Sequence, residues 1–191
     1  DEKNNLICAI IVLVVTLVLS FVLSFIMTKN EETQEVAESV ENTTEILAPI
    51  KGDIISLEEV KDQTFASGMV GEGFAIVPTE GKVYAPFDGK VDVMFETGHA
   101  VGLVGDNGIE LLVHIGIDTV NLEGKYFTPK KLAGDVVKKG DVLIEFDVEK
   151  IKEAGYDVTT PVIVSNTDQY AAVEKSATGK VTKESNLIRV Q

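Results

Sequence analysis

Short apolar runs separated by glycine-containing turns occupy most of the chain after residue 46. In several runs, such as KVDVMF and DVLIEF, apolar and polar residues alternate with the two-residue period of a half-buried β-strand. The runs span residues 73–77, 90–95, 100–104, 109–115, 141–146 and 161–165. Turn signals lie between them, such as GDNG at 105–108. The pattern predicts an all-β fold, an antiparallel β-sandwich or barrel-like domain.

Helical periodicity is weak in the same region. Two segments come closest to a period of 3.6 residues, DVEKIKEAGY at 147–156 and NTDQYAAVEKSA at 166–177. Both are brief, so we expect short helices at the periphery of the sheets.

The folded region also contains an internal repeat. LAPIKGDIISL at 47–57 and YAPFDGKVDVM at 84–94 both read Ala-Pro-x-x-Gly and continue into an alternating run. Proline ends one extended segment, and glycine permits the tight turn that opens the next strand. GDVVKKGDVLIEFD at 134–147 adds another glycine-bounded strand unit. We therefore expect pseudo-duplicated half-units that cannot close a core alone.

The beginning of the chain has a different character. Residues 6–27 form a stretch of 22 residues without a charge. As a helix this stretch would span about 30 Å of hydrocarbon, which predicts one transmembrane helix. A buried core helix is rarely apolar on every side over such a length. A secretory signal peptide would have a shorter apolar stretch and a small-residue cleavage site.

An acidic segment separates this stretch from the repeat-containing region. Residues 28–45 hold six glutamates and few apolar side chains, which predicts a solvated linker. The folded domain is then expected at 46–191. Because the chain begins with Asp1 rather than Met, we expect it to be a piece of a longer protein.

The net charge of −14 narrows the choice of partner. Nucleic acid is held through its phosphates by Lys and Arg, so a chain this acidic is not expected to bind it. An acidic surface favours a basic protein partner instead. The single cysteine, Cys8, lies in the apolar stretch, so the sequence offers neither a disulfide nor a cysteine metal cluster.

Both histidines of the chain, His99 and His114, flank one predicted hairpin. A turn centred between Asp106 and Asn107 places residue 104 opposite 109, and His99 directly opposite His114. Their Cβ atoms would then lie about 5 Å apart on one face. We therefore expect the two imidazoles to be neighbours.

The same register assigns the two faces of the hairpin. One face is small and apolar, and we expect it to point into the core; it carries Ala100, Gly102, Val104, Ile109, Leu111 and Val113. The other face surrounds the histidines with apolar side chains, as a docking surface would. It carries His99, Val101, Leu103, Glu110, Leu112 and His114.

Two adjacent imidazoles are compatible with three kinds of role. They can be structural, satisfied by hydrogen bonds. They can bind zinc, although zinc usually takes at least three protein ligands and no HxxxD…HxH or HExxH pattern is present. Alternatively, one ring can accept a phosphoryl group while the other stabilises its charge. The chain has no GxxxxGK[ST] loop, so we do not expect the phosphoryl donor to be a nucleotide bound here.

Residues 46–191 resemble the glucose-type IIA domain of the bacterial phosphoenolpyruvate-dependent sugar phosphotransferase system. The resemblance rests on ordered phrases along nearly the whole domain: ILAPIKGDI, VGEGFAIVP, APFDGKV, FETGHA, ELLVHIGIDTV, VKKGDVLIEFD and TPVIVSN. It implies a β-sandwich in which His114 accepts a phosphoryl group on Nε2 from the carrier phospho-HPr. His99 would stabilise and pass on the phosphate, and Thr97 would hydrogen-bond within the site.

The resemblance also implies a docking surface and no cofactor. Asp62 and Asp118 match acidic positions that meet a basic patch of HPr. An apolar rim would be supplied by Phe65, Met69, Val70, Phe95, Leu112 and Ile115. Neither a metal ion nor an organic cofactor would be required.

Helix 6–27 and linker 28–45 resemble the junction between a IIC permease domain and a fused IIA domain. β-Glucoside, sucrose and trehalose permeases of this kind carry IIB, IIC and IIA in one chain. This implies IIB and IIC as partners, a IIB cysteine as the next phosphoryl acceptor, and a cell-membrane location with the IIA domain on the cytoplasmic side. Two alternatives are a membrane-anchored zinc peptidase of the lysostaphin kind, with a related β-fold, and a regulatory domain that docks on transporters.

Overall fold

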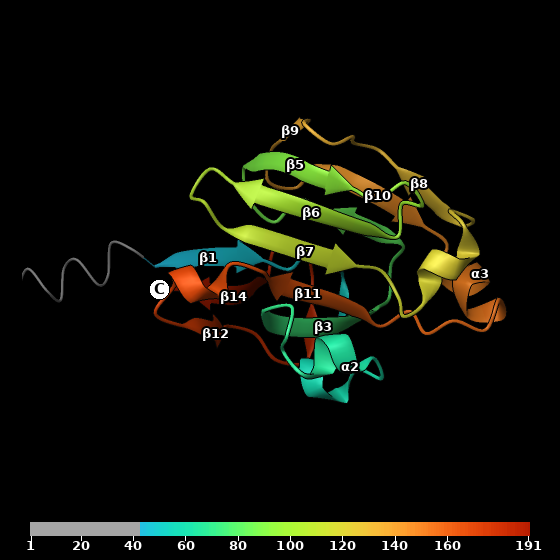
Figure 1. Cartoon of the computed structure of the whole chain (residues 1–191), viewed down its shortest axis with the longest axis horizontal. Helices are drawn as coiled ribbons and strands as arrows, with labels where there is room; N and C mark the ends of the chain where they lie inside the picture. The colour runs from blue at the N-terminus through green and yellow to red at the C-terminus, as the bar shows by residue number, and fades with distance from the viewer. Residues whose placement is uncertain (1–42) are drawn as a thin grey trace, which may run out of the picture. The chain divides into compact units, whose positions relative to one another are not determined.

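The computed structural model describes residues 43–191, which are built almost entirely from β-strands (Figure 1). The predicted membrane helix 6–27 and residues 28–42 of the predicted linker lie outside the described residues. Within the described part of the chain, no helix has the length and apolar character needed to cross a membrane.

Each of the six apolar runs forms a strand, as predicted. These strands are β3 (Glu72–Pro78), β5 (Gly89–Met94), β6 (Ala100–Gly105), β7 (Glu110–His114), β10 (Val142–Phe146) and β11 (Thr160–Val164). The others are β1 (Thr44–Leu47), β2 (Gly52–Ser56), β4 (Lys82–Tyr84), β8 (Phe127–Pro129), β9 (Val136–Val137), β12 (Val173–Lys175), β13 (Lys180–Val181) and β14 (Asn186–Val190). The folded unit spans Thr44–Gln191, so it begins two residues before the boundary predicted at 46.

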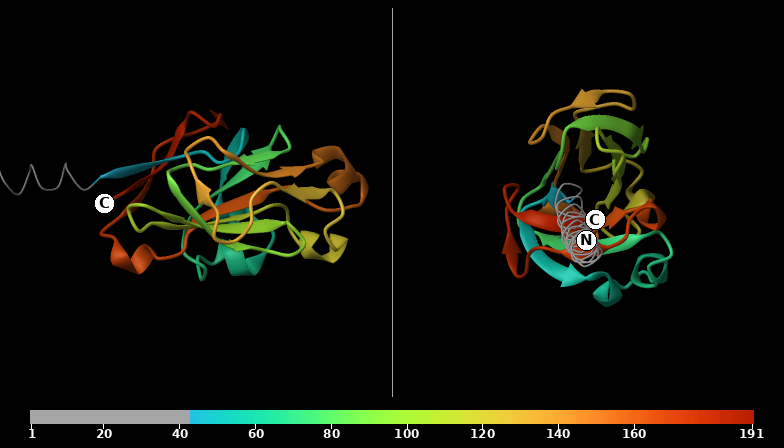
Figure 2. Two further views of the ribbon diagram at one scale, coloured as in Figure 1. Left: turned by 90° about the horizontal axis from the view of Figure 1, so that it is seen from above. Right: turned by 90° about the vertical axis from the view of Figure 1, so that its left-hand side faces the viewer.

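The helices are short and lie at the periphery of the strands (Figure 2). They are η1 (Leu57–Glu59), α2 (Gln63–Ala66), η2 (Thr119–Leu122), α3 (Val148–Glu153) and η3 (Thr167–Gln169). Helix α3 confirms the prediction at 147–156. The helix predicted at 166–177 is wrong, because only η3 forms before β12 pairs with β14. That pairing packs Val173 against the main core, and tertiary burial outweighs a weak local helical preference.

The strands form three antiparallel sheets around one main core. The largest sheet has eight strands in the order β13-β2-β3-β11-β7-β6-β5-β9, and the smaller ones are β1-β14-β12 and β4-β10-β8. Buried side chains from all three sheets meet in the main core, for example Val113, Ile144 and Ile188. The domain is therefore a β-sandwich, in agreement with the prediction.

The pseudo-duplication is visible in the register of the strands. Ile188 lies opposite Ile46 in one small sheet, and Ile144 lies opposite Val83 in the other. Both pairs stand beside a register shift at the corresponding point of the strand. In the large sheet, β11-β3-β2-β13 on one side of the centre corresponds to β7-β6-β5-β9 on the other.

The glycine of each Ala-Pro-x-x-Gly repeat is required for a close approach of two strands. A Cβ atom at Gly52 would lie 2.1 Å from the carbonyl oxygen of Val77, and one at Gly89 would lie 2.2 Å from that of Val104. Each glycine is the first residue of its strand, β2 or β5. The repeated motif therefore encodes the same backbone contact twice.

Gly52→Ala and Gly89→Ala are each expected to destabilise the domain by about 2–3 kcal/mol, because the added methyl group must displace a main-chain carbonyl. Gly102→Ala is the matched control: its Cβ would lie no closer than 3.7 Å to a neighbour, the Cβ of Val93. Its effect should stay within about 1 kcal/mol. Urea unfolding measures the difference, and equal losses at Gly89 and Gly102 would contradict the steric explanation.

Candidate functional site

The hairpin formed by β6 and β7 has a three-residue loop, so the predicted register is wrong by one residue. The amide of Gly105 donates to the carbonyl of Ile109 at 2.9 Å, and Ala100, not His99, lies opposite His114. Gly108 closes the loop with a φ of 83°, a conformation that suits three-residue hairpin loops. The sequence GDNG did not distinguish this loop from a two-residue turn.

The one-residue shift exchanges the two faces of β6 and leaves those of β7 as predicted. Val101 and Leu103 are fully buried with Leu111 and Val113 in the core. Ala100, Gly102 and Val104 instead share the outer face with the three residues predicted there from β7, namely Glu110, Leu112 and His114. Leu112 and His114 are half-buried, so this face is partly open.

The two histidines are neighbours even though they are not paired across the strands. His99 precedes β6, in a turn where Gly98 has a φ of 67°. This turn brings its ring to the side of His114, with ring centroids 4.9 Å apart and planes at 81°. The hydroxyl of Thr97 forms a hydrogen bond with Nδ1 of His99. The predicted cluster of Thr97, His99 and His114 therefore exists.

The orientation of the His114 ring is set by the turn that follows β7. Nδ1 lies 2.8 Å from the carbonyl oxygen of Gly116. Because a carbonyl can only accept, Nδ1 carries the proton and Nε2 carries the free lone pair. Gly116 has a φ of 75°, and a Cβ there would lie 2.7 Å from the carbonyl oxygen of Asp157. The hydroxyl of Thr119 donates to the carbonyl of Ile115 and braces the same turn.

Burial makes both imidazoles hard to protonate. Desolvation, followed by the nearby ring of His114, lowers the pKa of His99 from 6.5 to about 4. Desolvation also lowers the pKa of His114, while the Gly116 carbonyl and the carboxylates of Asp62 and Asp118 act in the opposite direction. Both rings are therefore neutral at pH 7.

Two phenylalanines flank the histidine pair. The ring of Phe65 lies 5.0 Å from that of His114, and the ring of Phe95 lies 5.4 Å from that of His99. Phe65 comes from α2 and is buried, whereas Phe95 follows β5 and is 42% exposed. The four rings form a row in which each imidazole contacts one phenyl ring and the other imidazole.

The two acidic positions expected at the site both lie near His114. Asp62 caps α2 by accepting a hydrogen bond from the amide of Thr64 at 2.7 Å, and Asp118 precedes η2 with a φ of 59°. They line one open cleft together with Lys61 and Asp157, which form an ion pair of 3.2 Å. The cleft is open to solvent, so a basic group can reach these carboxylates.

The predicted apolar rim needs two corrections, because Phe65 is only 8% exposed and Ile115 is fully buried. Met69 is 84% exposed, and Val70 is half-buried. Ile115 is fully buried in the main core, because successive side chains of a strand point to opposite faces and its neighbour His114 points outward. Ile115 therefore cannot belong to the rim.

Two exposed apolar residues beside the site were not predicted. Val120 follows Asp118 in η2 and is 49% exposed. Val93 is 44% exposed because a register shift between Val91 and Val93 interrupts the alternation of β5. Alternation alone would place Val93 in the core beside Val91, so no sequence signal identified it.

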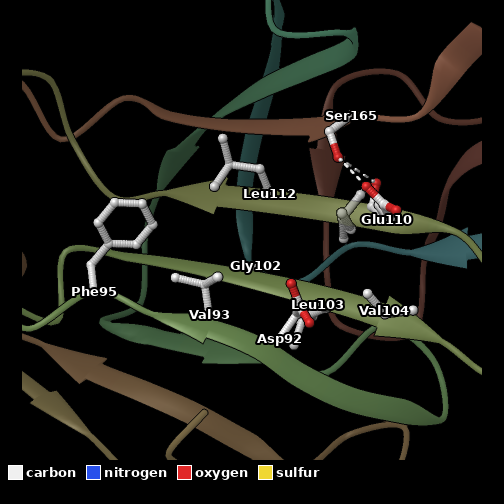
Figure 3. Close-up of a pocket in the computed structure, with 10 residues that line it drawn as sticks. Asp92, Val93, Phe95, Gly102, Leu103, Val104, Glu110, Leu112 and Ser165 are labelled. Carbon is white, nitrogen blue, oxygen red and sulfur yellow. Dashed lines mark hydrogen bonds between the residues drawn. The ribbon is translucent and has the colours of Figure 1, made fainter. Parts of the chain in front are cut away.

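An apolar depression extends from Phe95 along the outer face of β5, β6 and β7 (Figure 3). Phe95, Val93 and Leu112 surround it, and Gly102 leaves its floor without a side chain. At the opposite end the hydroxyl of Ser165 lies 3.5 Å from a carboxylate oxygen of Glu110. The face beside the histidines can therefore accommodate an apolar surface of a partner.

The described residues offer few side chains that could bind a metal ion together. Among residues 43–191, no group of three or more His, Cys, Asp or Glu side chains is arranged to hold a metal ion. The peptidase alternative would need such a group around His99 and His114.

Comparison with known proteins agrees with the geometry of the site. Residues 44–170 match the family model of the phosphoenolpyruvate-dependent sugar phosphotransferase system, EIIA 1. The chain is 49% identical over 159 residues to the β-glucoside-specific EIIBCA component of Dickeya chrysanthemi, which covers 83% of this chain and 25% of that protein. It is 47% identical over 137 residues to the glucose-specific EIIA component of Staphylococcus epidermidis, covering 72% of this chain and 82% of that protein.

The solved glucose permease IIA from Mycoplasma capricolum superposes with a TM-score of 0.72 at 33% identity, covering 78% of this chain and 96% of that one. The chain spans about a quarter of the length of the β-glucoside relatives. The match to the family model covers the strands and turns that carry both histidines. The chain therefore belongs to the EIIA 1 family of the phosphoenolpyruvate-dependent sugar phosphotransferase system.

Proposed function

We propose that His114 is the residue that carries the phosphoryl group in this relay. The hydrogen bond from its Nδ1 to the Gly116 carbonyl supports this role most directly. It leaves the lone pair on Nε2, the nitrogen farther from the turn, and keeps the neutral ring in one orientation. A neutral, oriented imidazole is the form that can attack phosphorus.

In the first step, phospho-HPr docks and its phosphoryl group moves to Nε2 of His114. The P–N bond of the donor histidine breaks as the new P–N bond forms, and the donor ring keeps the electron pair. In the proposed arrangement the Thr97 hydroxyl donates to Nδ1 of His99, which places the ring proton on Nε2, and Nε2–H donates a hydrogen bond to a phosphoryl oxygen. That contact stabilises charge that builds up in the transition state.

In the second step, the phosphoryl group leaves His114 for a cysteine of a IIB domain. The P–N bond breaks, a P–S bond forms with the thiolate, and His114 returns to its neutral state. No metal ion or organic cofactor takes part in either step. The β-glucoside relatives carry EIIB and EIIC in the same chain, which supports IIB and IIC as partners of this domain.

The acidic and apolar surroundings of His114 support docking of a basic carrier. Asp62 and Asp118 would attract the positive patch of HPr, and Met69, Phe95 and Leu112 would contact its apolar side chains. The full protein would lie at the cell membrane, anchored through residues 6–27, with this domain on the cytoplasmic side where HPr is found. The family match leaves the zinc peptidase alternative without support.

His114→Gln is expected to abolish phosphorylation by labelled phosphoenolpyruvate, Enzyme I and HPr, because it removes the accepting nitrogen. His99→Gln should still become labelled but should pass the phosphate to IIB at least about tenfold more slowly, because the imidazole N–H that donates to the phosphoryl oxygen is replaced by an amide in a different position. Base-stable, acid-labile label on the domain measures the first step, and loss of label to added IIB measures the second. Normal onward transfer by His99→Gln would refute the role of His99.

Asp118→Asn is expected to raise KM for phospho-HPr about threefold to tenfold at low salt, because one attractive charge is lost. Asparagine tolerates the positive φ at this position, so the backbone should be retained. Removing this carboxylate lowers the pKa of His114 further, so the rate at saturating phospho-HPr should not fall. The KM ratio should shrink as salt is added; a ratio independent of ionic strength would argue against charge steering.

The stability of the domain should fall in acid because His99 is buried in its neutral form. Its pKa of about 4 in the folded state lies below 6.5, so the unfolded chain binds the proton more readily. The corresponding stability is complete above pH 6.5 and is lost as the pH falls towards 4. Between about pH 7 and about pH 4.5, the wild type should lose about 2–3 kcal/mol more than His99→Gln in urea unfolding. Parallel losses in the two proteins would contradict the buried neutral state.

A further inference from the structure

The segment between β2 and β3 covers His114 with a buried aromatic ring. This segment contains η1 and α2 and packs on the outer face of the large sheet through a cluster separate from the main core. The cluster consists of Leu57, Val60, Phe65, Ala75, Ile117 and Ile163. Phe65 also contacts the imidazole of His114, with centroids 5.0 Å apart and planes at 53°.

We propose that Phe65 is a positioning residue that holds the His114 imidazole in its accepting orientation and keeps water from it; the proposal rests on the function proposed for His114. Phe65 and His99 contact the imidazole, and the Gly116 carbonyl holds Nδ1. The three contacts come from α2, from the turn before β6 and from the turn after β7. Together they orient the ring and leave Nε2 available.

The burial of Phe65 distinguishes it from a residue that serves only in docking. The Phe65 side chain is 8% exposed, whereas that of Met69, later in the same segment, is 84% exposed. A partner protein can therefore gain little contact area from Phe65. Most of its surface already contacts the domain, and its ring contact with His114 exists without a partner.

The charged and titratable groups around His114 predict in which direction its pKa should change when a neighbour is removed. The ring is faced by His99, by Asp62 at the start of α2 and by Asp118 before η2. Loss of the Phe65 ring admits water and should raise the pKa of His114 towards 6.5. Loss of the Asp62 carboxylate should lower the pKa, because that carboxylate raises it at present. The two effects have opposite signs, so displacement of α2 can be separated from loss of the ring.

The test uses Phe65→Leu, which keeps apolar volume, and Phe65→Ala in the domain 43–191. The fold exists as a chain of this size, because the match covers 96% of the Mycoplasma capricolum chain. Nitrogen-15 NMR of the imidazoles reports pKa and tautomer without any partner, and His99→Gln assigns the two rings. The wild type should show His114 protonated at Nδ1. Both variants should raise its pKa by about half a unit or more and mix its tautomers.

Phosphoryl transfer is measured in parallel. At saturating phospho-HPr, Phe65→Leu should lower the rate about tenfold, since a small misplacement of a reacting group is costly. The loss should grow below about pH 6.5, where more of the acceptor is protonated. KM for phospho-HPr should change much less than the rate.

Two variants serve as matched controls. Leu57→Ala removes packing from the same cluster but keeps the phenyl ring that contacts His114, so it should lower stability and leave the pKa and tautomer of His114 unchanged. Asp62→Asn retains a residue that caps a helix and should lower the pKa of His114.

An unchanged pKa and tautomer in both Phe65 variants, with only KM raised, would make Phe65 a docking residue and overturn the proposal. Equal changes in the pKa and tautomer of His114 in Leu57→Ala would also overturn it, because loss of packing alone would then explain them. Failure of the wild type to accept phosphate from charged HPr would instead refute the proposed function, and with it the acceptor role of His114, while the NMR results would still report the ring contact.

Discussion

Nδ1 of His114 donates a hydrogen bond to the carbonyl oxygen of Gly116, and the chemistry available to the ring depends on this bond. The bond selects the tautomer, because a carbonyl cannot donate, and so it determines which nitrogen keeps its lone pair. The turn that presents the carbonyl is itself tightly constrained. Gly116 has a positive φ and no room for a side chain, and the hydroxyl of Thr119 holds the preceding carbonyl.

Burial and charge act in opposite directions at this ring. Burial lowers the pKa of His114, while the Gly116 carbonyl, Asp62 and Asp118 raise it. The His114 ring is therefore neutral at pH 7, yet it lies close to carboxylates that can attract a basic group. In the proposed relay, phosphorylated His114 would carry negative charge next to these carboxylates, which would weaken its hold on the phosphoryl group and favour onward transfer.

The duplicated fold carries this site in only one of its two halves. The pair Ile76 and Thr160 in one half corresponds to the pair Leu103 and Leu111 in the other. Counted from these pairs, the position of β11 that corresponds to His114 of β7 is Ile163. Ile163 is fully buried beneath the segment that holds η1 and α2. One half of the sandwich thus has its outer face covered by a longer connection, and the other half keeps that face open. Phe65 extends from the covering segment to the histidine of the open half.

The local pattern of the sequence was sufficient to predict the strands, the repeat, helix α3 and the meeting of the two histidines. These features depend on alternation, on glycine and proline at fixed spacing, and on the two histidines placed around one hairpin. The resemblance of ordered motifs along residues 46–191 to one family then supplied the expected roles of Thr97, Asp62 and Asp118. None of these inferences required knowledge of which strands pair over long distances, apart from the hairpin itself.

Tertiary structure decided what local pattern leaves open. The loop after β6 has three residues rather than two, so Val101 and Leu103 face the core. A register shift in β5 turns Val93 outward, and pairing with β14 converts part of 166–177 into a strand. By itself the sequence determined which elements form and which side chains carry the chemistry. Register and burial were decided only when distant strands packed, because a shift of one residue costs little locally and yet reverses the face on which every later side chain lies.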